Sequence, residues 1–266
     1  MTEIYVGDVR LHVPNQGFGP ALLLVHGFPL DHTMWRHQIR QFAGKYKVLA
    51  PDLRGFGASD ISPGTVTMED YADDMAALLD ALRVDKVVFC GLSMGGYIAF
   101  QFAKHYPDRL AGLILCDTRA VPDTPEAAQN REALAAKVLK EGTSALAEDM
   151  MKKLFAPATL ESGSDEIASI RAVMENARPE GVAAALRGLA ARPDSRELLG
   201  QIEVPTLVIV GEHDAISPPD EMKAIADAIP GAEFLLVEGA GHMAPLEKPE
   251  PVNAAIGAFL EKHAKA

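Results

Sequence analysis

Short apolar runs recur along the chain, and glycine, proline or aspartate bounds each of them. Residues 3–13 instead alternate between apolar and polar side chains around a possible turn at Gly7-Asp8, which predicts an N-terminal antiparallel pair. Uninterrupted apolar runs are typical of parallel strands that are buried on both faces. These runs occupy Ala21–Val25, Val48–Ala50, Lys86–Cys90, Leu113–Cys116, Leu207–Val210 and Phe234–Val237.

Helical patterns separate the apolar runs. Between residues 68 and 82 the apolar side chains form one stripe, and Thr67 is the predicted N-cap. The stripe comprises Met68, Tyr71, Ala72, Met75, Leu79 and Leu82, and the last helix has a similar one at Val252, Ile256, Phe259 and Leu260. Strict alternation of strands and helices predicts an α/β fold with a mostly parallel, doubly wound sheet.

The segment 121–195 interrupts this alternation, because it contains only helical patterns broken by proline and glycine. We expect about four short helices here, so that 1–120 and 196–266 form the core and 121–195 a helical cap. The cap is either a covering layer or, as we favour, a lid over the carboxyl ends of the strands, where open α/β sheets bind ligands. Its apolar residues either shape a pocket or face the core; they include Leu146, Met150, Leu154, Met174 and Leu186.

Composition narrows the class of protein. With 48% hydrophobic and 23% charged residues, the chain is not expected to be disordered. The net charge of −12 and the lack of a basic cluster exclude an electrostatic nucleic-acid footprint. No apolar run approaches the roughly 20 residues that span a bilayer, so no membrane partner is expected. The protein is predicted to be a monomer or a small homo-oligomer.

The cellular compartment is predicted from the cysteines and the N-terminus. Cys90 and Cys116 lie inside apolar runs, which indicates buried thiols in a reducing compartment. The first residues form a strand pattern and not a leader peptide, although a leader upstream of Met1 stays an open alternative. We therefore expect a cytoplasmic protein.

The most specific motif is Gly91-Leu92-Ser93-Met94-Gly95-Gly96, which follows a predicted strand directly and opens a helical pattern. In that context Gly-x-Ser-x-Gly is typical of a nucleophile elbow, a strained turn that lifts the serine above the sheet edge. The helix N-terminus beside it favours developing negative charge. A flexible Ser/Gly turn is the alternative. The motif predicts Ser93 as a nucleophile.

A nucleophilic serine needs a positioned base and a carboxylate that orients the base. Of the eight histidines, His242 is the best candidate base, because it lies in a glycine-rich loop just after the last predicted strand. Asp214 follows the preceding strand and is the predicted acid, with Asp117, after another strand, as the alternative. The order Ser93, Asp214, His242 is that of elbow serine hydrolases. We expect solvent-exposed positions on strands or helices for His12, His37, His105 and His263. The role of base is less well suited to His26, His32 and His213.

Acyl transfer also needs N–H donors that bind the developing oxyanion. The backbone N–H of Met94, which follows the nucleophile, is one predicted donor. The loop after the first parallel strand supplies the other, the N–H of Phe28, because Gly27 allows a close backbone approach and Pro29 has no N–H.

Together these motifs resemble the α/β-hydrolase superfamily over essentially the whole chain. They are His26-Gly27-Phe28-Pro29, Pro51–Ser59, Gly91–Gly96, Gly211–Asp214 and Gly241-His242. Within the superfamily, Leu115–Ala120 and Pro179–Ser195 resemble bacterial carboxylesterases related to 3-oxoadipate enol-lactonases. The resemblance implies a serine carboxylesterase that hydrolyses short- to medium-chain esters through an acyl-enzyme. The alternatives are a lactonase or enol-lactonase, and a slow-turnover ligand receptor with an intact triad; perhydrolase activity is a possible side reaction.

Other chemistries are disfavoured. Haloalkane dehalogenases and epoxide hydrolases use an aspartate where this chain has Ser93. His-Glu-x-x-His spacing and a dinucleotide-binding glycine fingerprint are both missing, so neither a metal nor another cofactor is expected in the reaction. Asp52 and Arg54 are expected to make structural polar contacts. Arg119 either meets a dicarboxylate substrate or lies in solvent.

Overall fold

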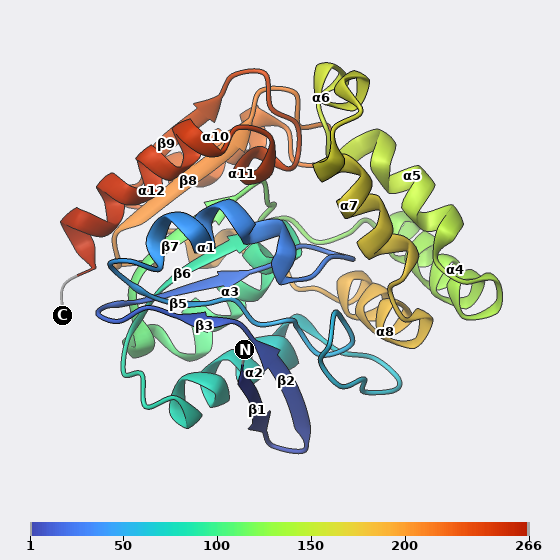
Figure 1. Cartoon of the computed structure of the whole chain (residues 1–266), viewed down its shortest axis with the longest axis horizontal. Helices are drawn as coiled ribbons and strands as arrows, with labels where there is room; N and C mark the ends of the chain where they lie inside the picture. Colours follow the sequence, from blue (N-terminus) through green and yellow to red (C-terminus); the bar gives the residue numbers. More distant parts are fainter. Residues whose placement is uncertain (1, 265–266) are drawn as a thin grey trace.

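A seven-stranded sheet runs through the centre of the computed structural model, which describes residues 2–264. The strand order is β3-β5-β4-β6-β7-β8-β9, and every neighbouring pair is parallel except β3 with β5. The predicted mostly parallel, doubly wound α/β sheet is therefore confirmed (Figure 1). Its strands are β3 (Asn15–Gln16), β4 (Ala21–Val25), β5 (Lys47–Leu49), β6 (Val87–Leu92), β7 (Leu110–Cys116), β8 (Thr206–Gly211) and β9 (Glu233–Val237).

The alternating N-terminal segment forms the predicted antiparallel pair, β1 (Thr2–Val6) and β2 (Val9–Val13). Val6 pairs with Val9, so Gly7 and Asp8 make the turn, and Gly7 adopts a φ of 59°. This pair is a separate two-stranded sheet. Its inward apolar side chains join the core on one face of the large sheet.

Burial on both faces is confirmed for the central strands but is wrong for β9. All residues of β4, β6 and β8 are buried. In β9, which ends the sheet and has a neighbour on one side only, Leu236 is 42% exposed. The short strand β3 was not predicted, because its two polar residues carry no periodic signal.

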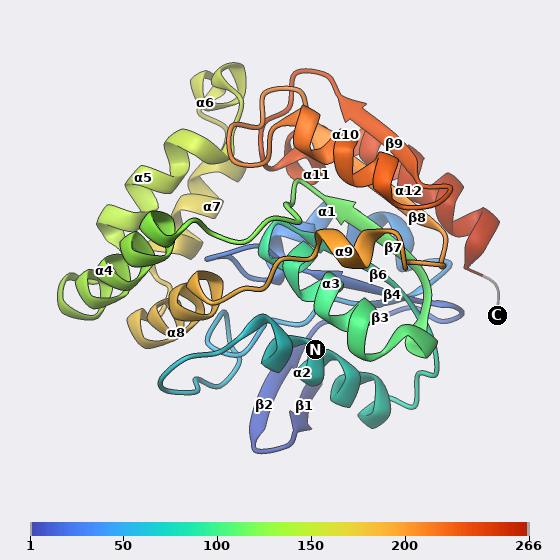
Figure 2. The same ribbon diagram turned by 180° about the vertical axis from the view of Figure 1, so that it is seen from behind.

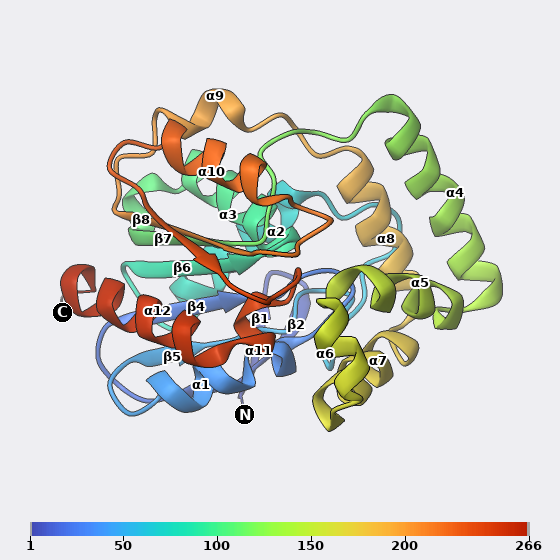
Figure 3. The same cartoon turned by 90° about the horizontal axis from the view of Figure 1, so that it is seen from above.

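Helices cover both faces of the sheet, as the alternation predicts (Figure 3). The helices α1 (Arg36–Phe42) and α12 (Pro249–His263) pack on one face, with the side chains of Leu22 and Leu24. The helices α2 (Met68–Ala81), α3 (Met94–His105) and α10 (Pro219–Ala228) pack on the other, with Leu23 and Val25. Thr67 caps α2 as predicted and forms a capping box with Asp70.

The strand-free insertion contains five helices, one more than expected: α4 (Pro125–Glu141), α5 (Ser144–Leu154), α6 (Pro157–Ser162), α7 (Asp165–Glu175) and α8 (Pro179–Ala190). The shortest is α6, a six-residue helix whose C-cap, Gly163, adopts the left-handed conformation. All five gather beside one end of the sheet (Figure 2). A short helix, α9 (Arg196–Leu199), then leads back to the sheet.

The backbone of helix α8 packs directly against the backbone of the core. An added Cβ at Gly188 would lie 1.8 Å from the Val66 carbonyl oxygen, so only glycine allows the two backbones this approach. The N–H of Val66 in turn donates to the Ala184 carbonyl oxygen at 3.2 Å. Four of the predicted apolar cap side chains are buried, while Met150 is half-buried; the buried ones are Leu146, Leu154, Met174 and Leu186.

Two simpler expectations concern the cysteines and membrane segments. Cys90 and Cys116 are free and buried, as their apolar surroundings predict. Within residues 2–264, we find no helix with the length and apolar character needed to cross a membrane.

Candidate active site

The predicted elbow is a sharp turn between β6 and α3. Ser93 adopts φ 54° and ψ −111°, a strained conformation for a residue with a side chain. The Ser93 N–H donates to the Cys116 carbonyl oxygen at 2.9 Å, and the Thr118 hydroxyl donates to the Ser93 carbonyl oxygen at 2.7 Å. A Cβ at Gly91 would lie 2.2 Å from the Gly95 carbonyl oxygen. The turn therefore requires the small residues that the motif provides.

His242 and Asp214 are in direct contact. His242 Nδ1 lies 2.8 Å from Asp214 Oδ2, and both side chains are buried. The other carboxylate oxygen accepts hydrogen bonds from the backbone N–H groups of Ile216 and Ser217, at 2.8 and 3.0 Å. The two loops follow β8 and β9, which are adjacent parallel strands, so their carboxyl ends meet at one sheet edge.

Ser217 belongs to the same cluster, although sequence analysis did not identify it. Its hydroxyl donates to Asp214 Oδ2 at 2.8 Å and lies 3.2 Å from His242 Nδ1. The side chain is fully buried. Its only sequence signal is its position three residues after the predicted acid.

The electrostatics favour an ionised Asp214. Burial by itself raises the pKa of this carboxyl, but the charge and hydrogen bond of His242 and the donors of Ser217 outweigh it, and the pKa lies below its ordinary value. An ionised carboxylate can hold the proton of His242 on Nδ1, which leaves Nε2 with its lone pair. The pair is thus equipped to act as an oriented base.

Within residues 2–264, no hydrogen bond joins the alternative acid, Asp117, to His242. Asp117 Oδ1 accepts the N–H of Gly211 at 2.8 Å, and its buried Oδ2 has no hydrogen-bond partner. Burial, followed by the nearby charge of Asp214, raises the pKa of Asp117 well above its ordinary value. The two neighbouring carboxyls therefore differ, because the pKa of Asp214 is lowered and that of Asp117 is raised.

One hydrogen bond of the predicted triad is not formed. In the described part of the chain, residues 2–264, no hydrogen bond joins Ser93 to His242. Such bonds are often long without substrate and shorten only when it binds. The elbow follows β6, two strands from β8 in the same parallel sheet, so Ser93 lies at the edge that also carries Asp214 and His242.

The predicted oxyanion loop approaches the elbow closely. A Cβ added to Gly27 would lie 3.4 Å from the Cβ of Ser93 and 2.8 Å from Leu92 Cδ2. The loop can come this close to the elbow because Gly27 has no side chain. Within residues 2–264, no hydrogen bond engages the backbone N–H of Phe28 or of Met94.

His26 supports this loop, a role that its sequence position alone did not reveal. Its Nδ1 lies 2.9 Å from the Gly27 carbonyl oxygen, and its Nε2 accepts the N–H of Leu53 at 3.0 Å. These partners place the ring proton on Nδ1. Burial lowers the pKa of His26, so the fully buried ring stays neutral.

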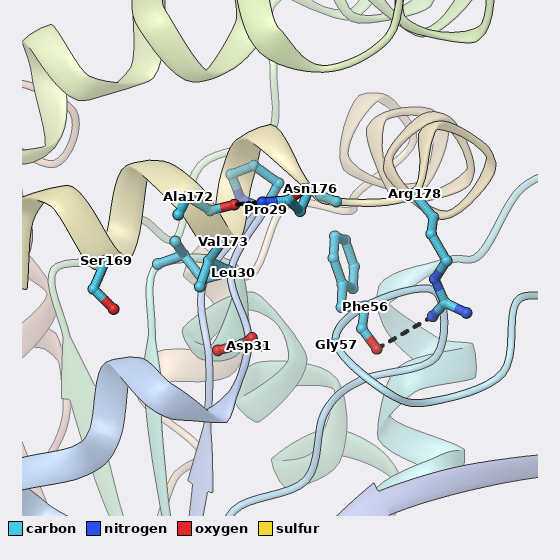
Figure 4. Close-up of a pocket in the computed structure, with 11 residues that line it drawn as sticks. Pro29, Leu30, Asp31, Phe56, Gly57, Ser169, Ala172, Val173, Asn176 and Arg178 are labelled. Carbon is cyan, nitrogen blue, oxygen red and sulfur yellow. Dashed lines mark hydrogen bonds between the residues drawn. The ribbon is translucent and has the colours of Figure 1, made fainter.

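A cavity of about 410 Å³ lies between the oxyanion loop and the inserted helices (Figure 4). Figure 4 shows Pro29, Leu30 and Asp31 facing side chains of α7 across it. Arg178 lies at one end and donates to the carbonyl oxygens of Phe56 and Ser59. Neither Ser93 nor His242 lines this cavity. The lining residues are Pro29, Leu30, Asp31, Phe56, Gly57, Ser169, Ala172, Val173, Asn176, Ala177 and Arg178.

Surface exposure was predicted correctly for His105 but not for His12, His37 or His263, which are half-buried. The partners of His37 and His12 are distant in the sequence, whereas that of His263 lies one turn earlier on the same helix. His37 lies 2.6 Å from Glu166 on α7, the ring of His263 packs on Phe259, and that of His12 packs against His32.

The remaining predictions concern Asp52, Arg54 and Arg119; those for the two former are confirmed, and neither alternative for Arg119 is. Asp52 accepts hydrogen bonds from His32 and Ala58, and Arg54 pairs with Asp74, so the expected structural contacts are confirmed. Arg119 instead donates two hydrogen bonds to Glu221, at 2.8 and 3.0 Å. It is therefore neither a free surface arginine nor an unpaired cation ready for a dicarboxylate.

Comparison with known proteins places these features in a family. Residues 22–255 match the alpha/beta hydrolase family. The 3-oxoadipate enol-lactonase 2 of Acinetobacter baylyi is 30% identical over 257 residues, which cover 96% of this chain and 94% of that protein.

Two solved structures are also similar. An esterase from Thermogutta terrifontis, solved with malate bound, is 50% identical with a TM-score of 0.95, over 97% of this chain and 95% of that one. The enol-lactonase from Burkholderia xenovorans is 31% identical with a TM-score of 0.92, over 98% of this chain and 100% of that one.

These matches confirm the predicted resemblance to carboxylesterases related to 3-oxoadipate enol-lactonases, and they confirm the α/β-hydrolase fold. They extend over the sheet, the elbow and the inserted helices together. The chain belongs to the alpha/beta hydrolase family.

Proposed function

We propose that the protein is a serine carboxylesterase that hydrolyses small esters with short to medium acyl chains and needs no cofactor for the reaction. The observation that carries the proposal is the buried hydrogen bond between Asp214 and His242, at the sheet edge where Ser93 lies on a strained elbow. A surface turn that only connected β6 to α3 would not need this strain. The esterase from Thermogutta terrifontis, with 50% identity, supports the same activity.

In the proposed first half-reaction, Ser93 Oγ attacks the acyl carbon while Nε2 of His242 takes the hydroxyl proton. Asp214 holds the opposite edge of the ring and stabilises the imidazolium. The N–H groups of Phe28 and Met94 bind the oxyanion of the tetrahedral intermediate. The C–O bond to the alcohol then breaks, and His242 returns its proton to the departing oxygen.

In the second half-reaction, His242 takes a proton from water, and the resulting hydroxide attacks the acyl-enzyme. The same N–H groups bind the second oxyanion. The bond to Ser93 Oγ breaks, Ser93 regains its proton from His242, and the carboxylic acid leaves. Every proton movement involves one imidazole nitrogen, which explains why the orientation of the ring matters.

We infer that the insertion 121–195 acts as a cap that shapes the substrate site. Two observations support this role. The cavity of about 410 Å³ lies between Pro29, next to the predicted oxyanion donor, and Val173 of α7. Its lining combines apolar side chains with a few polar ones, as ligand pockets do. This cavity would hold the part of the ester that lies beyond the reacting carbon.

The direct test is turnover of p-nitrophenyl acetate, butyrate and octanoate, combined with labelling by an organophosphonate. The wild-type protein should turn over many times, and Ser93→Ala should abolish both turnover and labelling. Ser164→Ala, at an exposed position on the cap, is the matched control and should behave as wild type. Stoichiometric labelling of Ser93→Ala would contradict the proposal.

A lactonase is the second candidate, favoured by enol-lactonase relatives at 30 and 31% identity over nearly the whole chain. A lactone is a cyclic ester, so the same residues would open it, with the leaving alcohol staying attached to the acyl group. Comparing kcat/KM for γ- and δ-lactones with that for open-chain esters separates the two. A receptor would instead release about one equivalent of product and stop.

A further inference from the structure

Three side chains from separate segments meet outside the candidate active site. His12 lies on β2, His32 begins the 3-10 helix η1 (His32–Trp35), and Asp52 follows β5. One potential metal-ligating atom from each lies within 4.8 Å of the other two. Imidazoles are donors suited to transition-metal ions, and a carboxylate beside them can orient a ligating ring.

The backbones that carry His12 and Asp52 are held together. Asp52 donates its N–H to the His12 carbonyl oxygen at 2.9 Å, and His12 donates its own N–H to the Ser59 hydroxyl at 2.8 Å. That hydroxyl donates to the Asp52 carbonyl oxygen at 2.6 Å. The relative positions of these two residues therefore do not depend on an added ion.

Asp52 orients the ring of His32. Its Oδ1 accepts hydrogen bonds from the His32 ring Nδ1 at 2.6 Å and from the His32 backbone N–H at 2.9 Å, while Oδ2 accepts the Ala58 N–H at 2.9 Å. In metal sites, a carboxylate bound to one imidazole nitrogen fixes the tautomer and leaves the other nitrogen as the ligand. The same arrangement here leaves Nε2 of His32 with a free lone pair.

The distance between the rings of His12 and His32 is close to that expected for two imidazoles that bind the same ion. Their centroids are 5.4 Å apart and their planes are tilted by 47°. Two imidazoles bound to one tetrahedral ion, each with its nitrogen about 2.0–2.1 Å from the metal, would have centroids roughly 5 Å apart. His32 also borders an open hollow of about 570 Å³, whose lining includes Arg36 and Arg40, so the His32 ring is reached from solvent.

We propose that His12 and His32 bind a divalent transition-metal ion such as Zn²⁺, with Asp52 as the positioning carboxylate and water in the remaining coordination positions. The ion would connect the β1–β2 hairpin to the segment that follows the oxyanion loop. It therefore stabilises the fold and takes no part in ester hydrolysis. If no ion binds, the cluster is simply an ion pair between His32 and Asp52, packed against a second ring.

The experiment is isothermal titration of the full chain, free of any histidine tag, with ZnCl₂ at pH 8. We expect one ion per chain, with affinity at least about tenfold weaker in His12→Ala and in His32→Ala. His37→Ala is the matched control, because His37 also lies 2.6 Å from a carboxylate, while within residues 2–264 the paired histidine rings are those of His12 and His32. It should bind Zn²⁺ as wild type does, and MgCl₂, which prefers oxygen ligands, should not bind at this site.

Thermal unfolding gives an independent readout. Zn²⁺ should raise the Tm of the wild-type chain and not that of His12→Ala, since an ion that binds only the folded state stabilises it. His12→Ala is the decisive variant, because it leaves every hydrogen bond of Asp52 in place, whereas His32→Ala removes one. No binding at millimolar Zn²⁺, or equal affinity in wild type and His12→Ala, would overturn the proposal. Turnover of p-nitrophenyl esters is scored separately, so neither proposal depends on the other.

Discussion

At the residue scale, the two buried carboxyls near His242 differ in their environments. Asp214 accepts several donors and its pKa is lowered, whereas Asp117 has an unpartnered oxygen and a raised pKa. Environment, not residue type, therefore assigns them different roles.

The first prediction compares Asp214→Asn with Asp117→Asn in steady-state turnover. In Asp214→Asn the amide favours the wrong imidazole tautomer, which lowered turnover about 10⁴-fold in a well-studied serine protease. We expect a loss of several orders of magnitude here. Asp117→Asn should reduce kcat only mildly, because within residues 2–264 no hydrogen bond joins Asp117 to His242. The opposite ranking, in variants that circular dichroism shows to be folded, would transfer the role of acid to Asp117.

Ser217 provides the second residue-scale prediction. Removing its hydroxyl in Ser217→Ala deletes one charge-assisted hydrogen bond to Asp214, while two backbone donors remain. At about 1.5 kcal/mol for such a bond, kcat should fall roughly tenfold. KM should stay unchanged, because the hydroxyl is buried behind the His242 ring and does not meet substrate. An unchanged kcat in a folded variant would mean that the backbone donors suffice.

At the element scale, the insertion is defined by where its helices meet the core. The helix α8 packs against the core backbone near Val66, and α7 faces the oxyanion loop across the cavity. These contacts suit a cap whose pocket-facing side is α7. They also explain why several apolar cap residues pack inward and are unavailable to substrate.

The third prediction tests the role of α7. Val173→Phe would fill part of the cavity of about 410 Å³. We expect KM for p-nitrophenyl octanoate to rise several-fold while that for the acetate changes little, because only longer chains would need this space. Ala168→Phe adds bulk to the exposed face of the same helix and serves as the control. Equal effects on acetate and octanoate would show that the cavity does not hold the acyl chain.

At the scale of the whole molecule, one buried acid couples stability to pH. Burial raises the pKa of Asp117 in the folded state well above 3.8, the ordinary value at which it ionises in the unfolded chain. Between these two pKa values the folded state binds more protons, so stability falls as pH rises. Each unit by which folding raises the pKa costs up to about 1.4 kcal/mol at higher pH.

The fourth prediction therefore concerns Asp117→Asn in thermal unfolding from pH 4 to pH 8. An uncharged amide removes this cost and still accepts the Gly211 N–H, so the Tm advantage of the variant should grow as pH rises. Asn also tolerates the positive φ of 46° at this position. A Tm difference that stays constant across the range would show that Asp117 does not titrate in this window.

Sequence by itself determined the sheet, the elbow and the order of the candidate site residues. These features depend on local patterns: apolar runs mark buried strands, and Gly-x-Ser-x-Gly marks a turn that only small residues allow. The capping box at Thr67 is local for the same reason. The residues of β9 alone could not predict the exposure of its side chains, because exposure depends on whether a neighbouring strand exists.

Tertiary structure alone decided which side chains meet. Asp117 and Asp214 each follow a parallel strand, so the sequence left both as candidates, and only the packing of the loops joined Asp214 to His242. The same holds for Ser217 and for the contact between His12 and His32, which are 20 residues apart in the chain. Hydrogen bonds between loops depend on distances of a few tenths of an ångström, and these are set by the packing of the whole sheet.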